Sequence, residues 1–469
     1  MSFKPVMLWT DAMIFLLLAM AIAGAWWIMQ RPHLLLPWKR LFKNRLGMVS
    51  LLVLSLFVVI GLLDSLHYRV ALPENSHNGK TAYAAEVLSV FDVLVSDLRS
   101  QTEKTYSAPL AVYLYAKESM ETPEGKILRD YPRLKYAGAH LADPQNEHLG
   151  DVIKRSLFGL FSGWLGGVLL ALLIVSFAAA RSRTNARAWV EARQGTPLNA
   201  MLATLVVLAM LIGLIVNLSA AYHVLGTDKV GQDVLYLSLK SIRTGLVIGT
   251  VTTLVMLPIA LFFGIAAGYF RGWIDDVIQY IYTVLSSIPG VLLIAAAVLM
   301  MQVTIEKHAE WFSSAAERAD LRLLLLCLIL GLTSWTGLCR LLRGETLKLR
   351  ELEYIQAAQS FGVSSLRILS RHILPNVMHI VLIAVVMDFS ALVLAEAVLS
   401  YVGVGVDPST NSFGTLINNA RLEMGREPMV WWTLAAAFSF MLVLVLAANL
   451  FADAVRDAFD PRLNRTGDI

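Results

Sequence analysis

The chain has 469 residues, of which 57% are hydrophobic and only 16% are charged, and its mean hydropathy is +0.63. Soluble globular proteins carry about 25% charged residues, so this composition excludes a disordered chain, a disulfide-stapled scaffold and an ordinary cytosolic enzyme. The net charge is +4, and the basic residues stand in loops between apolar segments, so nucleic acid is not an expected partner. Cys327 and Cys339 share one apolar segment, about 18 Å apart along a helix, which is too far for a disulfide.

Apolar stretches long enough to cross a bilayer recur along most of the chain. A membrane-spanning helix needs about 20 predominantly apolar residues. By this criterion the sequence predicts nine spans, at 11–29, 46–63, 156–180, 200–222, 243–270, 276–303, 321–342, 376–400 and 430–452. The expected fold class is therefore all-α, a polytopic transmembrane helical bundle.

The distribution of lysine and arginine predicts how these spans are oriented. Short loops rich in these residues remain in the cytoplasm. The segments 30–45, 181–199 and 343–375 are such loops, and with nine spans all three fall on the same side of the membrane. We therefore expect the N-terminus outside and the C-terminus in the cytoplasm.

The long segment 64–155 then falls outside the membrane. Its mixed charges and scattered prolines suit a small folded extracytoplasmic insert. Within it, residues 81–99 repeat apolar side chains at helical spacing, which predicts an amphipathic helix. No motif in the insert identifies a ligand.

The cytoplasmic segment 345–375 has the pattern of two helices joined by a glycine turn. Gly362 is expected to end the first helix with a positive φ, and Ser364 to cap a second short helix. Apolar residues of the first helix are expected on one side: Leu349, Leu352, Tyr354, Ile355, Ala358 and Phe361. From periodicity alone, an ordinary amphipathic helix at the membrane surface explains the segment equally well.

The residues themselves favour a more specific interpretation. The pattern Ala357-Ala358-x3-Gly362-x11-Leu374-Pro375 resembles the EAA loop of binding-protein-dependent ABC importer permeases. In that family the loop is a coupling helix that docks into a groove on the cytoplasmic ATPase. Gln356 stands where the family usually has glutamate, so the resemblance implies docking without an ion pair at this position. The implied coupling residues are Tyr354, Gln356, Ala357, Ala358, Phe361, Gly362, Leu374 and Pro375.

Three further segments resemble boxes of the same family. Residues 225–234 (LGTDKVGQDV) are similar to an LGTDxxGRDV box, with Gln232 in place of arginine. Residues 395–408 (AEAVLSYVGVGVDP) and 453–462 (DAVRDAFDPR) are similar to an outer-loop box and a C-terminal box. Together they resemble the second permease subunit of oligopeptide, dipeptide and nickel importers (the OppC/DppC type). The implied outer-loop residues are Gly226, Thr227, Asp228, Gly231, Asp233, Glu396, Gly403, Gly405 and Pro408.

The resemblance implies a division of the chain into a permease core and additions. The core, of the type I ABC importer kind, is expected at 223–469, and such permeases typically have six spans. The additions are the N-terminal spans at 1–63, the insert at 64–155 and a helical hairpin at 156–222.

The resemblance also implies the partners and the location. A bacterial inner-membrane permease of this kind works with a second homologous permease, two P-loop ATPases that bind ATP-Mg, an extracytoplasmic substrate-binding protein and the membrane lipid. The chain contains no G-x-x-x-x-G-K-[ST] motif, so we expect neither a cofactor nor an ATPase site of its own. A peptide is the expected substrate, and nickel is less favoured because histidine and cysteine do not cluster.

Two acidic residues in the eighth span leave an alternative open. Asp388 and Glu396 are ionisable groups at membrane depth, where such groups are costly and often functional. At 100° per residue they point about 80° apart, so a carboxylate dyad is not expected. Glu396 is expected to fix the outer loop, and Asp388 to face the translocation path or a neighbouring subunit. The alternative function is a proton-coupled secondary transporter that uses both as a relay. An intramembrane enzyme is a third alternative, without a metal motif to support it.

Overall fold

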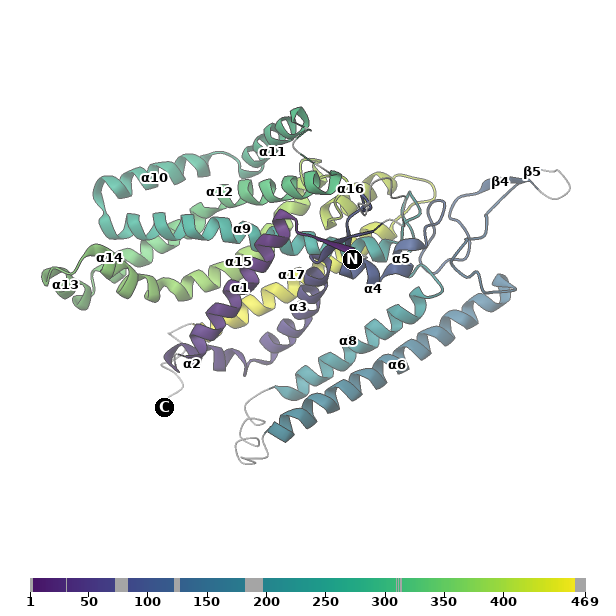
Figure 1. Ribbon diagram of the computed structural model, residues 1–469, viewed down its shortest axis with the longest axis horizontal. Helices are drawn as coiled ribbons and strands as arrows, with labels where there is room; N and C mark the ends of the chain where they lie inside the picture. Colours follow the sequence, from purple (N-terminus) through teal and green to yellow (C-terminus); the bar gives the residue numbers. More distant parts are fainter. Residues whose placement is uncertain are drawn as a thin grey trace.

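The computed structural model describes residues 3–30, 32–71, 83–121, 127–181, 197–308, 310, 312 and 314–459. These residues form an elongated, mostly helical body. Figure 1 shows α13 (Glu353–Ser360) and α14 (Ser365–Ile368) at one extremity, which we name the coupling end. The hairpin of β4 (Glu118–Glu121) and β5 (Ile127–Asp130) lies at the opposite extremity, which we name the insert end.

Within the described residues, nine helices are long and apolar enough to cross a membrane, which confirms the predicted all-α bundle. They are α1 (Trp9–Met29), α3 (Arg45–Asp64), α6 (Pro144–Arg181), α8 (Leu198–Ser219), α9 (Val234–Phe270), α11 (Gly290–Lys307), α12 (Ala315–Arg350), α15 (Leu374–Tyr401) and α17 (Trp432–Phe459). Several extend well beyond the predicted spans; for example, α9 begins nine residues before its predicted start, and α12 runs past its predicted span at both ends. Parts of the predicted basic loop 181–199 and of the C-terminal box lie outside the described residues.

The prediction of one helix across 276–303 is wrong. The chain forms α10 (Gly272–Ser287) and α11, separated by Ile288 and Pro289. Ile288 is extended, with φ −86° and ψ 131°, as a residue that precedes proline prefers. Pro289 lacks a backbone N–H, so it cannot continue α10 and instead stands directly before α11. Hydropathy alone does not detect this break because both halves are apolar.

Helices α9 and α12 form the central pair of the bundle. They lie side by side in the same direction, and small residues let their backbones approach closely. A Cβ added to Gly264 would lie 2.8 Å from the Cys339 carbonyl oxygen, and one added to Gly268 would lie 2.8 Å from that of Arg343. Cys339 is fully buried in this interface.

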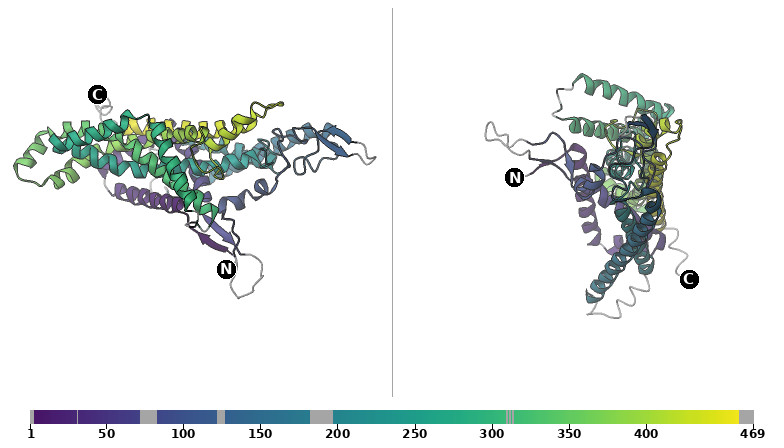
Figure 2. Two further views of the ribbon diagram at one scale, coloured as in Figure 1. Left: turned by 90° about the horizontal axis from the view of Figure 1, so that it is seen from above. Right: turned by 90° about the vertical axis from the view of Figure 1, so that its right-hand side faces the viewer.

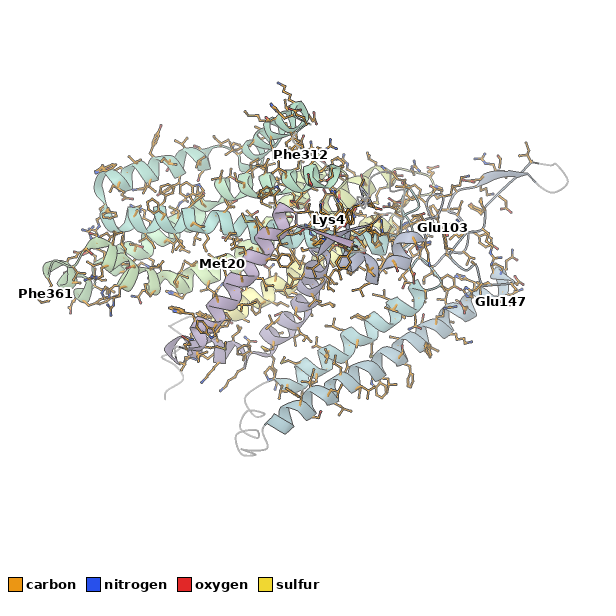
Figure 3. The ribbon with its side chains drawn as sticks, in the orientation of Figure 1. Lys4, Met20, Glu103, Glu147, Phe312 and Phe361 are labelled. Carbon is orange, nitrogen blue, oxygen red and sulfur yellow. The ribbon has the colours of Figure 1, made fainter. Side chains whose placement is uncertain are left out.

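The first described residues belong to a small sheet near the middle of the molecule, where Figure 3 labels Lys4. Strand β1 (Phe3–Val6) pairs antiparallel with β2 (His67–Val70), which pairs antiparallel with β3 (Leu88–Ser89). Phe3 pairs with Val70, so the start of the chain is joined to the segment predicted as the insert. This strand is not predicted by the sequence pattern, which groups residues 1–63 as N-terminal spans.

The predicted amphipathic helix at 81–99 is also wrong. The described part of this segment holds β3, then the short helices α4 (Val90–Leu94) and α5 (Ser96–Ser100). Ser89 sets the start of α4, because its hydroxyl accepts a hydrogen bond from the Asp92 N–H at 3.1 Å while the Asp92 carboxylate accepts from the Ser89 N–H. This reciprocal cap begins a helix at residue 90 and leaves residues 88 and 89 extended.

Helices α6 and α8 form a tightly packed hairpin beside the core (Figures 1 and 2). Gly159, Gly163 and Gly167 recur every four residues on the face of α6 that meets α8. A Cβ added to Gly163 would lie 2.4 Å from the Ala209 carbonyl oxygen. Spacing of this kind allows helices in a membrane to pack backbone against backbone. The hairpin meets the rest of the bundle through α3.

Two further helices complete the fold. Helix α2 (Pro32–Leu41) packs against α17 toward the coupling end, where Leu41 is buried among Ala454 and Val455. Helix α16 (Phe413–Glu423) packs between α15 and α17 toward the insert end. It therefore borders the outer loop that follows α15.

Candidate functional site

The coupling end consists of two short helices around a glycine, followed by a wide turn. Gly362 has a φ of +71° between α13 and α14, in the left-handed region that glycine adopts without steric cost. Ser364 precedes α14, but its side chain makes no capping hydrogen bond, so the predicted cap is wrong. A π-helical turn, η2 (Leu369–Ile373), then leads into α15.

Three isoleucines anchor this end to the bundle. Ile355, Ile368 and Ile373 are completely buried in the same apolar cluster as Trp335 and Leu342 of α12. Full burial of such side chains contributes about 1.5–3 kcal/mol each. The two short helices are therefore held firmly against the core.

The prediction that the apolar residues of α13 share one side is wrong. Ile355 is buried, whereas Phe361 is 87% exposed and projects from the extremity of the molecule in Figure 3. The exposed residues form an apolar patch, which we name the tip patch: Leu352, Tyr354, Ala357, Phe361 and Leu366. Exposed apolar side chains gathered in this way are a common feature of interaction sites.

The remaining predicted coupling residues lie beside the tip patch or at the start of α15. Gln356 is exposed, and its side-chain amide donates a hydrogen bond to the Glu351 carbonyl oxygen at 3.2 Å. Ala358 is half-buried beside the core. Leu374 and Pro375 form the first turn of α15, where the missing N–H of proline leaves no hydrogen bond unmade.

Polar contacts connect the coupling end to α9, α10 and α12. The Arg271 guanidinium, at the turn between α9 and α10, forms an ion pair with Glu351. The Gln359 amide donates a hydrogen bond to the Tyr269 hydroxyl at 3.4 Å. These two contacts join the coupling end to the end of α9.

The first outer-loop box, at the insert end, is bound to the insert. Thr227 is buried, and its hydroxyl donates to the Thr105 carbonyl oxygen at 2.8 Å and accepts from the Ser107 N–H at 2.6 Å. Gly226 and Gly231 have φ values of +72° and +77°. A Cβ on either would lie within 2.4 Å of an insert carbonyl oxygen, so these positions require glycine.

The two aspartates of this box shape its turn and start α9. The Asp228 carboxylate accepts hydrogen bonds from the Val230 and Gln232 N–H groups, both at 2.9 Å. Burial raises the pKa of Asp228 above its ordinary value. Asp233 is the N-cap of α9, because its Oδ1 accepts from the Leu235 N–H at 2.8 Å.

Sequence analysis missed the buried histidine that joins this box to the insert. His223 Nδ1 lies 2.7 Å from Asp233 Oδ2, and His223 Nε2 lies 3.6 Å from Glu103 Oε1. Burial favours the neutral ring, but these two carboxylates overcome it and raise the pKa of His223 to about 9. The imidazolium therefore forms an ion-paired link between the insert and the N-terminus of α9.

The second box holds the loop between α15 and α16. The Glu396 carboxylate accepts hydrogen bonds from the Ser400 hydroxyl at 2.6 Å and the Ser412 hydroxyl at 2.8 Å. Gly403 has a φ of +85°, and Gly405 stands so close to Ser400 that any Cβ would collide with its side chain. This loop is thereby fixed to the end of α15.

The two boxes, far apart in the sequence, line one pocket of about 350 Å³ at the insert end. Asp228 and Gln232 come from the first box and Pro408 from the second, while Tyr106 comes from the insert. Neighbouring Asn411 lies in the same outer loop as Pro408. The insert thus forms part of the surface that the two boxes share.

Asp388 lies apart from these sites. Its side chain is half-buried on α15, about 12 Å along the helix from Glu396. Among the described residues it has no ion pair within reach, and the Glu396 carboxylate is engaged by two serines. The geometry does not bring the two acids together.

A polar stripe on the insert-end half of α9 also escaped sequence analysis. Lys240 Nζ contacts Asp64 Oδ1 at 2.5 Å and Asp92 Oδ1 at 3.1 Å. One turn on, the Arg243 guanidinium contacts Asp11 Oδ1 at 2.6 Å and Asp320 Oδ1 at 3.7 Å. Two basic residues at the start of an apolar span are a signal for such buried pairing. Across the described residues, no group of three or more potential ligands could hold a metal ion.

Comparisons with known proteins identify the family of this chain. The family described as "Binding-protein-dependent transport system inner membrane component" matches residues 260–465. The oligopeptide transport system permease protein OppC of Mycobacterium tuberculosis is 33% identical over 239 residues, which cover 51% of this chain and 76% of the relative. The chain belongs to this permease family.

Other relatives of the permease carry related names. The glutathione transport system permease protein GsiD of Pectobacterium atrosepticum is 34% identical over 243 residues, covering 51% of this chain and 73% of its own. The dipeptide transport system permease protein DppC of Lactococcus lactis is 31% identical over 240 residues, covering 51% and 64%. An inward-facing structure of the MetNI methionine ABC transporter aligns with 48% of this permease and 97% of its own chain, at 15% identity and a TM-score of 0.37. None of these matches supports a proton-coupled transporter.

Proposed function

We propose that this permease is one of two membrane subunits of an ABC importer for peptides, and that its tip patch docks onto a cytoplasmic ATPase. The observation that carries the proposal is the tip patch itself, in which Phe361 is 87% exposed beside a glycine turn while Ile355 is fully buried. One face of α13 is anchored and the other is free for a partner.

The connections of the tip patch support a role in coupling. A rigid link is needed if closure of an ATPase dimer is to rock the spans. The buried isoleucines and the Arg271–Glu351 ion pair supply such a link to α9 and α12. Tyr354, Gln356, Ala357, Ala358, Phe361 and Gly362 would contact or shape the docking surface, and Leu374 and Pro375 would pass its motion to α15.

The insert end would receive the extracytoplasmic binding protein. The two outer boxes and the insert line one polar pocket there, so the insert at 64–155 would contribute to docking. This arrangement requires the N-terminus outside and the coupling end in the cytoplasm, which the basic loops also favour. Asp388, which forms no ion pair with any of the described residues, would face the translocation path formed with a second permease.

The substrate class follows from the relatives. Their names refer to oligopeptides, dipeptides and glutathione, all of which contain peptide linkages. The proposed complex contains this permease, a second homologous permease, two P-loop ATPases that bind ATP-Mg, and a binding protein. In this division of labour residues 223–469 form the permease core, while 1–63, 64–155 and 156–222 are additions to it.

Co-purification of the full-length protein with its partners tests the proposal. Phe361→Ala is expected to reduce the amount of ATPase recovered, by about tenfold for the loss of an anchor worth 1–2 kcal/mol. Phe158→Ala, at a residue 62% exposed on α6, is the matched control and should recover the ATPase as the wild type does. Equal recovery from both variants, or recovery of the wild-type chain without any ATPase, would refute the proposal.

A further inference from the structure

An apolar pocket lies between the added hairpin and the permease core. It has a volume of about 460 Å³, within the range of about 300–1,000 Å³ typical of small-molecule sites. Its walls come from α3, α8, α9 and α17, and short helices of the insert close its top. The residues that line it include Phe57, Leu98, Val216, Leu239 and Ser439.

The depth of this pocket places it in the hydrocarbon layer. Lys240 and Asp64 form an ion pair at the end of α3, which marks the polar boundary on the insert side. Phe57 lies seven residues before Asp64 in α3, about 10 Å below that boundary. A single leaflet of the hydrocarbon layer is about 15 Å thick, so the pocket spans most of the leaflet on the insert side.

The lining suits a hydrocarbon chain and little else. Almost all the lining side chains are aliphatic or aromatic. The two hydroxyls among them are already used, because Ser219 donates to the Val216 carbonyl oxygen at 3.1 Å and Ser439 donates to the Ala435 carbonyl oxygen at 2.7 Å. A buried water needs two to four polar partners, which this lining does not supply, so water would be excluded.

The pocket is continuous with the surface that faces lipid. Val216 on α8 and Val443 on α17, both in its wall, are 58% and 45% exposed. An acyl chain can therefore enter sideways from the bilayer. Phe91 and Leu98 of the insert lie over the top, so the headgroup of such a lipid remains at the side rather than above the pocket.

We infer that this pocket is a binding site for one acyl chain of a membrane phospholipid, held between α8 and the core and covered by the insert. The chain would fill the space enclosed by α8 on one side and by α3, α9 and α17 on the other. The inference does not depend on the proposed substrate or on ATPase docking.

Photolabelling of the intact importer tests this site. The complex is reconstituted in vesicles of phosphatidylethanolamine and phosphatidylglycerol that contain a trace of a phospholipid with a diazirine in mid-chain. After illumination, mass spectrometry compares adducts on Phe57 and Leu239, inside the pocket, with adducts on Phe161, which is 60% exposed on α6. We expect adducts at the two inner residues as well as at Phe161.

Three variants decide whether those adducts come from lipid in the pocket. Val216→Trp should fill the space and lower labelling of Phe57 and Leu239 about tenfold, while Phe161 labelling stays unchanged. Leu172→Trp, at a residue 59% exposed on α6, should leave all labelling unchanged, and Ser439→Leu should reproduce the effect of V216W from the opposite wall. Absence of inner adducts in the wild type, or equal labelling of Phe57 and Leu239 in V216W and L172W, would overturn the inference.

Discussion

His223 Nδ1 lies 2.7 Å from Asp233 Oδ2, and Asp233 is also the residue that caps α9. One carboxylate thus starts the central helix of the core with one oxygen and binds the imidazolium with the other. Because His223 Nε2 is 3.6 Å from Glu103 of the insert, the charge of this histidine holds the insert against the first outer-loop box.

The stability of this link should depend on pH. The pKa of His223 is raised from 6.5 to about 9, so its contribution is fully present below pH 6.5 and is lost as the pH rises through about 9. We expect the wild type to lose about 1–3 kcal/mol of stability between those values. His223→Gln should be less stable at pH 6.5 and should show a flatter profile. Thermal unfolding of both proteins between pH 6 and 10 measures this, and parallel profiles would contradict it.

The positive φ of Gly362 allows the role of the turn in coupling to be tested by a substitution that disturbs no side-chain contact. Its φ is +71°, and a Cβ added there meets no atom within 4 Å. Gly362→Ala should therefore strain only the backbone, by about 1–2 kcal/mol, and shift α13 relative to α14. We expect transport and stimulated ATP hydrolysis to fall while membrane insertion stays normal.

Gly344→Ala is the matched control for that substitution. Gly344 also has no atom within 4 Å of an added Cβ, but it lies inside α12. Alanine is favoured over glycine there by about 1 kcal/mol, so transport should be preserved. Uptake by the G362A variant equal to that of G344A would show that the turn is not needed for coupling.

Buried ion pairs should make Arg243 far more important for stability than an exposed arginine. Its guanidinium contacts Asp11 at 2.6 Å and approaches Asp320. Arg243→Met therefore leaves the buried Asp320 without a cation and leaves Asp11 with only His67, at 2.7 Å. The cost of breaking a buried pair in this way is about 3–5 kcal/mol. Arg271→Met removes an ion pair whose partners are 44% and 57% exposed, and should cost less than about 1 kcal/mol. Thermal unfolding in the same detergent compares them, and equal losses would rule out this account.

The sequence predicted those parts of the protein that local patterns determine. Gly362 was assigned a positive φ because a glycine followed a helical repeat, and the structure has it there. The apolar stretches likewise predicted where the spans lie. By contrast, Pro289 was overlooked inside a continuous apolar run, although its missing N–H breaks the helix.

Contacts between distant segments could not be predicted in the same way. Strand β1 forms only because β2 lies beside it, and a four-residue strand has no periodicity of its own to detect. His223 and Glu103 are 120 residues apart and belong to different predicted regions. Their pairing follows from the packing of the insert on the core, which no single stretch of sequence encodes.

The close packing of α6 on α8 gives a final prediction. Gly163→Ala places a methyl group 2.4 Å from the Ala209 carbonyl oxygen, and backbone atoms cannot yield to it as a flexible side chain would. The two helices must separate locally, so we expect this variant to be destabilised by about 1–3 kcal/mol. Gly166→Ala, three residues along the same helix with no atom within 4 Å, should be neutral or slightly stabilising. Thermal unfolding distinguishes the two, and a G163A variant as stable as G166A would mean that the hairpin does not depend on glycine contacts.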